Sequence, residues 1–243
     1  MTSRRNFLGF SSVSAMIAAA AASSTNAQPA AGAEQSKSTN AQNYNPVRTP
    51  NGWTLPHTEK DGIKEFHLIA EEIEHEFAPG SMAKCWGYNG TTPGPTIEAV
   101  EGDRVRILVT NALKEHTTGH WHGLILPSGM DGVGGLSQPQ IAPGETFAYE
   151  FDLKQHGTHM YHPHADEMTQ MALGMMGMFI IHPKEPEPID RDYCLLTHNW
   201  AMHPGTFRPD PSVMIDFDLW SFNSKVFPAI EPIVARTGER VRI

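Results

Sequence analysis

The chain alternates short apolar runs with turn residues along most of its length. Runs of about four to eight residues rich in β-branched and aromatic side chains indicate strands. Three clear examples are TIEAVEGDRVRILVTN (96–111), GETFAYEFDL (144–153) and GMFIIHP (177–183). The 21 Gly and 19 Pro residues separate these runs, whereas only residues 165–178 have a helical rhythm, which their glycines weaken. The pattern predicts an all-β sandwich or barrel.

One sequence pattern occurs twice. IEAVEGDRVRI (97–107) and PIVARTGERVRI (232–243) share an apolar start, a Gly followed by an acid, and Arg-Val-Arg-Ile. Two exposed strands could follow similar turns by chance. A repeat of the same structural unit is the alternative that we favour. We therefore expect a first domain at 53–185, a connection at 186–224 and the truncated start of a second domain at 225–243.

The amino terminus differs in composition from the rest. Paired arginines at Arg4 and Arg5 precede an apolar run that is too short to span a bilayer comfortably, and Thr25-Asn26-Ala27 offers a cleavage site. We interpret residues 1–27 as a twin-arginine signal peptide, with an amino-terminal anchor as the alternative. Residues 28–52 contain few large apolar side chains and are expected to form a flexible linker. This start predicts a periplasmic or extracellular protein.

Charge and cysteine content narrow the possible partners. The formal net charge is −9 and becomes more negative once Arg4 and Arg5 leave with the signal. Without a basic patch, we expect no nucleic-acid partner and no membrane association after signal cleavage. Cys85 and Cys194 could pair in an oxidising compartment or remain buried thiols, and the sequence leaves both possibilities open.

Two pairs of histidines are the strongest chemical signal. GHWHG places His120 and His122 around Trp121, and YHPH places His162 and His164 around a proline. Side chains alternate faces along a strand, so each pair should point to one side. Pro163 cannot donate a ladder hydrogen bond, which puts the second pair at a strand edge or loop mouth.

Two facing pairs would place four imidazoles around one small volume. Without a carboxylate or thiolate nearby, such a donor set favours copper or zinc. The remaining histidines, His198 among them, lack this pairing and are expected to be ordinary hydrogen-bonded or exposed residues. His159 lies three positions before His162, so along a strand its side chain should point to the opposite face.

The stretch TTPGPTIEAVEGDRVRILVTNALKEHTTGHWHG, followed by MDGV, PGETFAYEFDLKQHGTHMYHPH and GMMGMFIIHP, resembles the first cupredoxin domain of a multicopper oxidase. The resemblance covers about residues 85–183 and implies a Greek-key cupredoxin β-sandwich. It also implies a trinuclear copper cluster, with His120 on the type 2 ion and His122, His162 and His164 on the type 3 pair. In the family, two further motifs, H-x-x-H-x-H and H-C-H, lie near the carboxyl end and supply the other cluster ligands and the type 1 copper site. The resemblance of this chain does not include that part of the family.

The family resemblance also assigns an acid. Asp131, in SGMDG, matches the position of a residue beside the cluster and is expected to deliver protons or to support a ligand; an exposed turn Asp is the alternative. The methionines between Met168 and Met178 could bind Cu(I), although irregular core packing is favoured.

Three functions fit these observations. The favoured one is a laccase-like multicopper oxidase that uses O2 and a small reducing substrate, with a homotrimer as the expected assembly. This chain would be its amino-terminal part and is expected to be inactive as an oxidase by itself. The second is a copper-tolerance protein that sequesters or oxidises Cu(I). The third is a zinc hydrolase with three histidines and an open water position.

Overall fold

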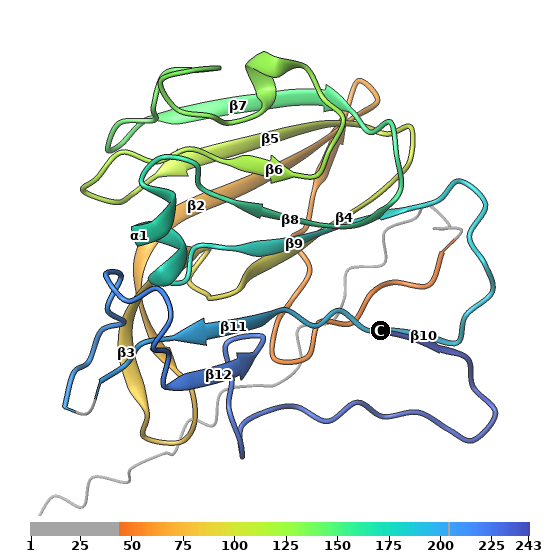
Figure 1. Ribbon diagram of the computed structural model, residues 1–243. Coiled ribbons are helices and arrows are strands. Elements are labelled where there is room, and N and C mark those ends of the chain that lie inside the picture. The colour runs from red at the N-terminus through yellow and green to blue at the C-terminus, as the bar shows by residue number, and fades with distance from the viewer. Residues whose placement is uncertain (1–43, 204) are drawn as a thin grey trace, which may run out of the picture. The chain divides into compact units, whose positions relative to one another are not determined.

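The computed structural model describes residues 44–203 and 205–243, and strands and loops make up nearly all of them (Figure 1). The predicted signal peptide and most of the predicted linker lie outside the described residues. No helix in the described part of the chain is both long and apolar enough to cross a membrane. The all-β prediction is confirmed, and the helical rhythm at 165–178 yields one short helix, α1 (Glu167–Ala172).

Two sheets form a sandwich around one apolar core. In the first sheet the order is β1-β2-β5-β7, and β3 also pairs with β2. In the second sheet the order is β4-β9-β8-β6. The β2–β5 and β4–β9 pairs are parallel, so the chain crosses to the other sheet and back before each of these pairs forms. The strands are β1 (Thr58–Lys60), β2 (Ile63–Glu76), β3 (Met82–Tyr88), β4 (Gly94–Val100), β5 (Arg104–Asn111), β6 (His120–His122), β7 (Thr146–Asp152), β8 (Gly157–His162) and β9 (Gly177–His182).

The burial pattern of β5 explains why this segment forms a strand. Val105, Ile107 and Val109 are fully buried and alternate with more exposed residues, as the period of a half-buried strand requires. Strand β4 is buried along nearly all of its length because it is covered on both faces. Its outer side contacts the segment before β1, where the Val47 amide donates to Glu98 Oε1 at 2.9 Å.

The last residues of the predicted linker, 28–52, pack against the sandwich. Val47 is buried with Ile180 and Cys194, and Arg48 forms a β-bridge with Tyr193. Residues 47–50 are therefore part of the folded unit, because Val47 gains an apolar contact that an isolated tether could not offer. Cys194 and Cys85 are both buried and unpaired, and burial raises the pKa of each thiol to about 12.

The remaining strands are short and lie below the second sheet in Figure 1. A two-stranded antiparallel sheet joins β11 (Thr197–Trp200) to β12 (Leu219–Phe222). Near the end of the chain, β13 (Val241–Arg242) pairs in parallel with β10 (Arg191–Asp192). The 3-10 helix η1 (Ser128–Met130) connects β6 to the loop before β7.

The repeated sequence pattern adopts the same local structure twice. Gly102 and Gly238 have φ of 92° and 93°, in the left-handed region that glycine tolerates. After the first turn, Val105 pairs in parallel with Lys64, and Lys64 Nζ lies 2.6 Å from Asp103.

The second turn has the same connections. Val241 pairs in parallel with Arg191, and Arg191 Nε lies 2.5 Å from Glu239. Each copy thus joins a glycine turn, an acid and a basic residue on the parallel neighbour, so the two sequence patterns have similar local structure.

Candidate metal centre

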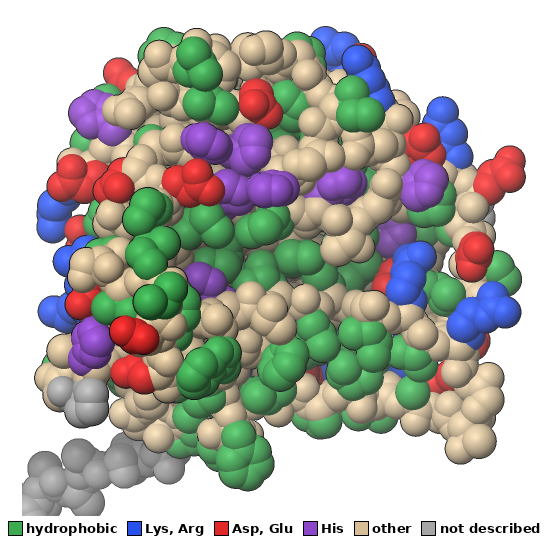
Figure 2. All heavy atoms as spheres, viewed as in Figure 1, with side chains coloured by type: hydrophobic (Ala, Val, Ile, Leu, Met, Phe, Trp, Pro, Cys, Tyr) green, Lys and Arg blue, Asp and Glu red, His purple; other side chains and the backbone are tan. Residues whose placement is uncertain are grey.

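Strands β6 and β8 bring the two histidine motifs together. The strands are antiparallel, with His120 opposite His162 and Trp121 opposite Tyr161. Trp121 and Tyr161 are buried in the core between the sheets. Because side chains alternate, His120, His122 and His162 must emerge on the other face of the second sheet. The histidine side chains gather there in Figure 2.

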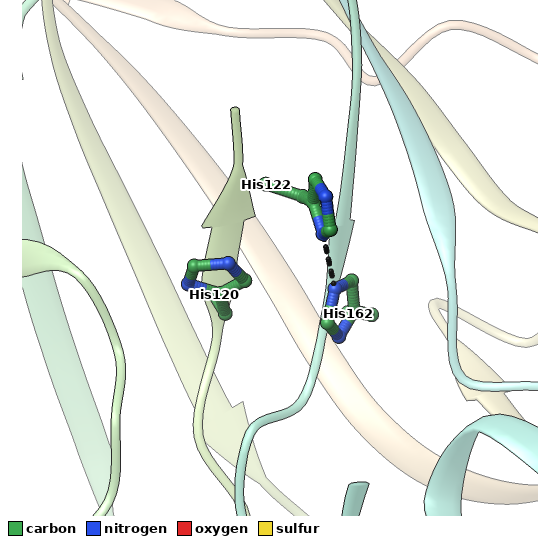
Figure 3. Close-up of side chains that lie close together, drawn as sticks. All are labelled: His120, His122 and His162. Atoms are coloured by element: carbon green, nitrogen blue, oxygen red, sulfur yellow. Dashed lines mark hydrogen bonds between the residues drawn. The ribbon is translucent and has the colours of Figure 1, made fainter. Parts of the chain in front are cut away.

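Three of the four rings form a compact group (Figure 3). One nitrogen from each of His120, His122 and His162 lies within 4.8 Å of the others. The ring centroid of His120 is 5.6 Å from that of His122 and 5.1 Å from that of His162. His122 Nδ1 and His162 Nε2 share a hydrogen bond of 3.0 Å. The predicted convergence of the two motifs is therefore present in the structure.

The fourth ring, that of His164, lies beside this group. Its centroid is 5.1 Å from that of His120 and 6.5 Å from that of His162. Strand β8 ends at His162, so Pro163 and His164 are in the following loop, as the proline predicted. The His164 amide donates to Thr118 Oγ1 at 2.9 Å, which ties this loop to the residues before β6.

The outer nitrogens of two rings are held by backbone carbonyls. His120 Nδ1 donates to the Asp131 carbonyl at 2.6 Å, and His162 Nδ1 donates to the Pro163 carbonyl at 2.9 Å. This arrangement leaves Nε2 of both rings unprotonated, as is usual around metal-bound histidines, and His162 Nε2 accepts the hydrogen bond from His122 Nδ1. Burial, the largest cause, lowers the pKa of His162, so this ring is neutral near pH 7.

Asp131 lies on the outer side of His120. It follows η1, and its main-chain oxygen holds the His120 ring, while its carboxylate Oδ1 lies 3.4 Å from the same Nδ1. The Asp131 side chain is 38% exposed, so it is in contact with solvent. The structure therefore places this predicted residue against the His120 ring, on the side away from Nε2.

Glu167 is a contact that sequence reasoning missed. Its carboxylate lies 3.8 Å from His162 Nδ1 and 3.7 Å from His164 Nε2. It is the first residue of α1, three positions after His164, and this spacing in YHPHADE was the available signal. The acid adds negative charge beside two rings and so favours a bound cation.

A buried polar support underlies the loop before β6. Gln170, on α1, accepts a hydrogen bond from Thr117 Oγ1 at 2.7 Å and donates one to the His116 carbonyl, also at 2.7 Å. Tyr149 Oη accepts from the Gly119 amide at 2.9 Å. These bonds fix the chain on both sides of Thr118 and so set the entry of β6. A lone polar residue such as Gln170 gave no sequence signal, because its partners come from distant segments.

The donor set suits a transition metal. Three imidazole nitrogens in a compact group fit copper, zinc, nickel or iron, and the two fixed outer nitrogens show that two of the rings are oriented in advance. Neither cysteine is in the group, since both thiols are buried elsewhere. Within the described residues, the site therefore has the chemistry of an all-histidine centre.

The sandwich and its imidazole group define a cupredoxin-type domain. Residues 70–186 match the family model described as multicopper oxidase. This region, slightly under half of the 243 residues, is therefore similar to the multicopper oxidase family, and solved multicopper oxidases share its fold.

Individual relatives agree with this assignment. The chain is 40% identical over 159 residues to a copper resistance protein A homolog of Pseudomonas syringae pv. tomato, which covers 63% of this chain and 26% of the relative. It is 36% identical over 155 residues to an L-ascorbate oxidase of Brassica rapa subsp. pekinensis, covering 60% of this chain and 26% of the relative. The chain thus spans about a quarter of the length of these curated relatives.

Solved structures show the same fold. A multi-copper oxidase from Pseudomonas thermotolerans superposes with a TM-score of 0.64 at 31% identity, covering 67% of this chain and 42% of that chain. A blue copper oxidase from Nitrosomonas europaea gives a TM-score of 0.64 at 33% identity, covering 73% and 58%. The predicted cupredoxin β-sandwich is confirmed.

Proposed function

We propose that this chain is the amino-terminal part of an exported oxidase that couples one-electron oxidation of a phenolic, amine or metal-ion substrate to four-electron reduction of O2 to water. The observation that carries the proposal is the compact group formed by His120, His122 and His162, with ligand atoms within 4.8 Å of one another. The similarity of residues 70–186 to the multicopper oxidase family supports copper as the metal.

The four histidines take different roles in this proposal. His120 would hold a type 2 copper, and His122, His162 and His164 would contribute to a type 3 pair. The bound ions would store electrons and reduce O2, with the remaining ligands and the type 1 copper supplied from outside these 243 residues. His120 and His162 present Nε2 because backbone carbonyls hold their Nδ1 atoms. Glu167 offsets the positive charge that collects near His162 and His164.

Asp131 is proposed to deliver protons to this centre. Its partly exposed carboxylate can exchange protons with solvent, and Oδ1 lies 3.4 Å from His120 Nδ1. Its carbonyl positions the His120 ring at the same time. Replacing the side chain alone therefore separates proton supply from positioning.

The whole protein is proposed to contain a second cupredoxin domain. The turn around Gly238, its ion pair and its parallel strand reproduce the connections around Gly102, which supports this repeat. The predicted leader at 1–27 supports export by the twin-arginine pathway to the periplasm or beyond. A homotrimer, with clusters completed between subunits, is the proposed assembly.

The second candidate function is copper tolerance, in which the protein sequesters copper or oxidises Cu(I). Two observations favour it: relatives carry the name copper resistance protein A, and methionines lie close to the histidine group. Both candidates need the same imidazole group, and they differ in whether O2 is consumed.

Copper reconstitution of the full-length protein tests the proposal. We expect intense blue absorption and oxygen uptake with a phenol or Cu(I), and loss of uptake when His120 or His162 is replaced by Asn. Tight copper binding without oxygen uptake would favour the tolerance function. One zinc and no copper in protein from copper-replete cells would overturn both. The 243-residue chain alone is expected to consume no oxygen.

A further inference from the structure

A second group of metal-binding side chains lies next to the imidazole group. A cavity of about 580 Å³ opens beside His122, and four methionines are among its lining residues: Met160, Met171, Met176 and Met178. A band of hydrophobic side chains lies directly below the histidines in Figure 2. None of the described residues that line this cavity is an Asp or Glu. Its donors are therefore soft sulfurs and imidazoles, without the carboxylates that harder cations need.

The register of the second sheet aligns three of these donors. His122 on β6 lies opposite Met160 on β8, and Met160 lies opposite Met178 on β9. Both pairs are antiparallel, so directly opposed side chains share a face with Cβ atoms about 4.5–5.5 Å apart. The sheet thus presents one imidazole and two thioethers in a row, and Met160 and Met178 are only half-buried.

His198 closes the cavity from another segment. It lies on β11, lines the cavity, and packs edge-on against Trp200 with ring centroids 4.5 Å apart. Its Nε2 is buried and has no hydrogen-bond partner among the described residues. Burial lowers its pKa to about 4, so the ring is neutral near pH 7. A buried polar atom without a partner carries a free-energy cost, which a bound metal would remove.

We propose that this cavity, which we name the methionine cavity, binds a Cu(I) ion through Met160, Met178 and His198, with Met171 as a further thioether at its edge. Thioethers and neutral imidazole are soft or borderline donors that select the cuprous ion over zinc or magnesium. Met175 shows the contrast: it is fully buried in the core cluster and does not line the cavity. Met160, Met171 and Met178, by contrast, line the cavity and are only half-buried.

The position of the methionine cavity suggests its use. His122 belongs to both the cavity and the imidazole group. A cuprous ion held at the cavity could pass to the histidines by ligand exchange, without electron transfer. The site itself does not depend on the proposed oxidase activity, because none of Met160, Met178 and His198 belongs to the imidazole group.

Anaerobic titration of the purified chain with Cu(I), in competition with a chromophoric Cu(I) chelator, tests the inference. The variant M160L/M178L removes two sulfurs while nearly conserving volume. M168L is the matched control, since Met168 is 58% exposed and lies outside the cavity. Mutating a residue that only supports a metal ligand typically lowers metal affinity by about tenfold or more. Losing two ligands should cost at least as much, so we expect the Cu(I) affinity of M160L/M178L to fall by about tenfold or more. H198Q should weaken it as well, and M168L should match the wild type.

X-ray absorption of the Cu(I) complex gives a readout independent of affinity. Sulfur scattering is expected in the wild type and in H120N, and it should be reduced in M160L/M178L. Thermal unfolding of each variant checks that it is folded. Wild-type affinity in M160L/M178L, or nitrogen-only scattering in the wild type, would overturn the inference. Failure of the proposed function would appear separately, as unchanged Cu(II) binding in H120N.

Discussion

The two histidine motifs reach the same site by different structural means. His120 and His122 lie within a regular strand, where Trp121 is buried between them and anchors the strand in the core. His162 ends β8, and Pro163 then turns the chain so that His164 extends from a loop. The first pair is therefore positioned by alternation along a strand. The second depends on backbone contacts at a strand end, and the predictions below test this difference.

The largest expected effect is on the packing that anchors the first motif. Trp121→Ala removes an indole with no exposed surface, and such core truncations cost about 3–5 kcal/mol in the free energy of unfolding. Urea unfolding of the metal-free chain measures this loss. His122→Ala is the control, because the exposed His122 should change stability by less than about 0.5 kcal/mol. Equal losses in the two variants would show that Trp121 does not anchor β6.

The next effect concerns metal binding by the two motifs. His120→Asn and His162→Asn each remove a member of the compact group, so Cu(II) affinity should fall by more than about tenfold. His164→Asn should have a smaller effect in this chain, because the His164 ring flanks the group. Competition titration with a chelator provides the affinities. His67→Asn, an exposed histidine on β2, serves as the control, and a loss in His164→Asn as large as in His162→Asn would contradict the ranking.

A smaller effect is expected at the hydrogen bond that joins the motifs. Thr118→Val leaves the His164 amide without its side-chain acceptor, at a cost of about 1 kcal/mol in the free energy of unfolding. Thr146→Val is the matched control, since that hydroxyl is exposed and bonds Thr110. Denaturant unfolding of both variants gives the comparison. If the two lose the same stability, the link between the motifs is not a stabilising one.

The smallest stability change is expected for Asp131→Asn. The backbone carbonyl that holds His120 remains, so the free energy of unfolding should change by less than about 0.5 kcal/mol and Cu(II) affinity should be nearly unchanged. If the full-length protein has the proposed oxidase activity, the same variant should slow oxygen consumption and alter its pH profile, because the proton-exchanging group is lost. An unchanged rate and pH profile would leave Asp131 with a positioning role only.

The sequence was sufficient for the features that depend on alternation and turn chemistry. The burial of Val105, Ile107 and Val109 follows from their spacing, and the placement of Trp121 opposite its flanking histidines follows from the same rule. The end of β8 at Pro163 follows from the missing amide donor.

Features that depend on distant partners could not be obtained in this way. The packing of Val47 against Ile180 needs the folded tertiary structure. The cavity position of His198 likewise depends on how β11 lies against the second sheet, so a lone histidine in the sequence looked unremarkable. The helix is also shorter than the predicted range 165–178. It ends at Ala172, and Met175 and Met176, which contributed to the helical rhythm, are buried beyond its end.

The paired turns at Gly102 and Gly238 also have a consequence for comparing genes. In each copy an acid after the glycine meets a base on the adjacent parallel strand, Asp103 with Lys64 and Glu239 with Arg191. Substitutions at the two positions of one such pair should be correlated across homologous chains, with loss of the acid accompanied by loss of its base. That covariation would mark each glycine turn in sequences too divergent to align by their histidines.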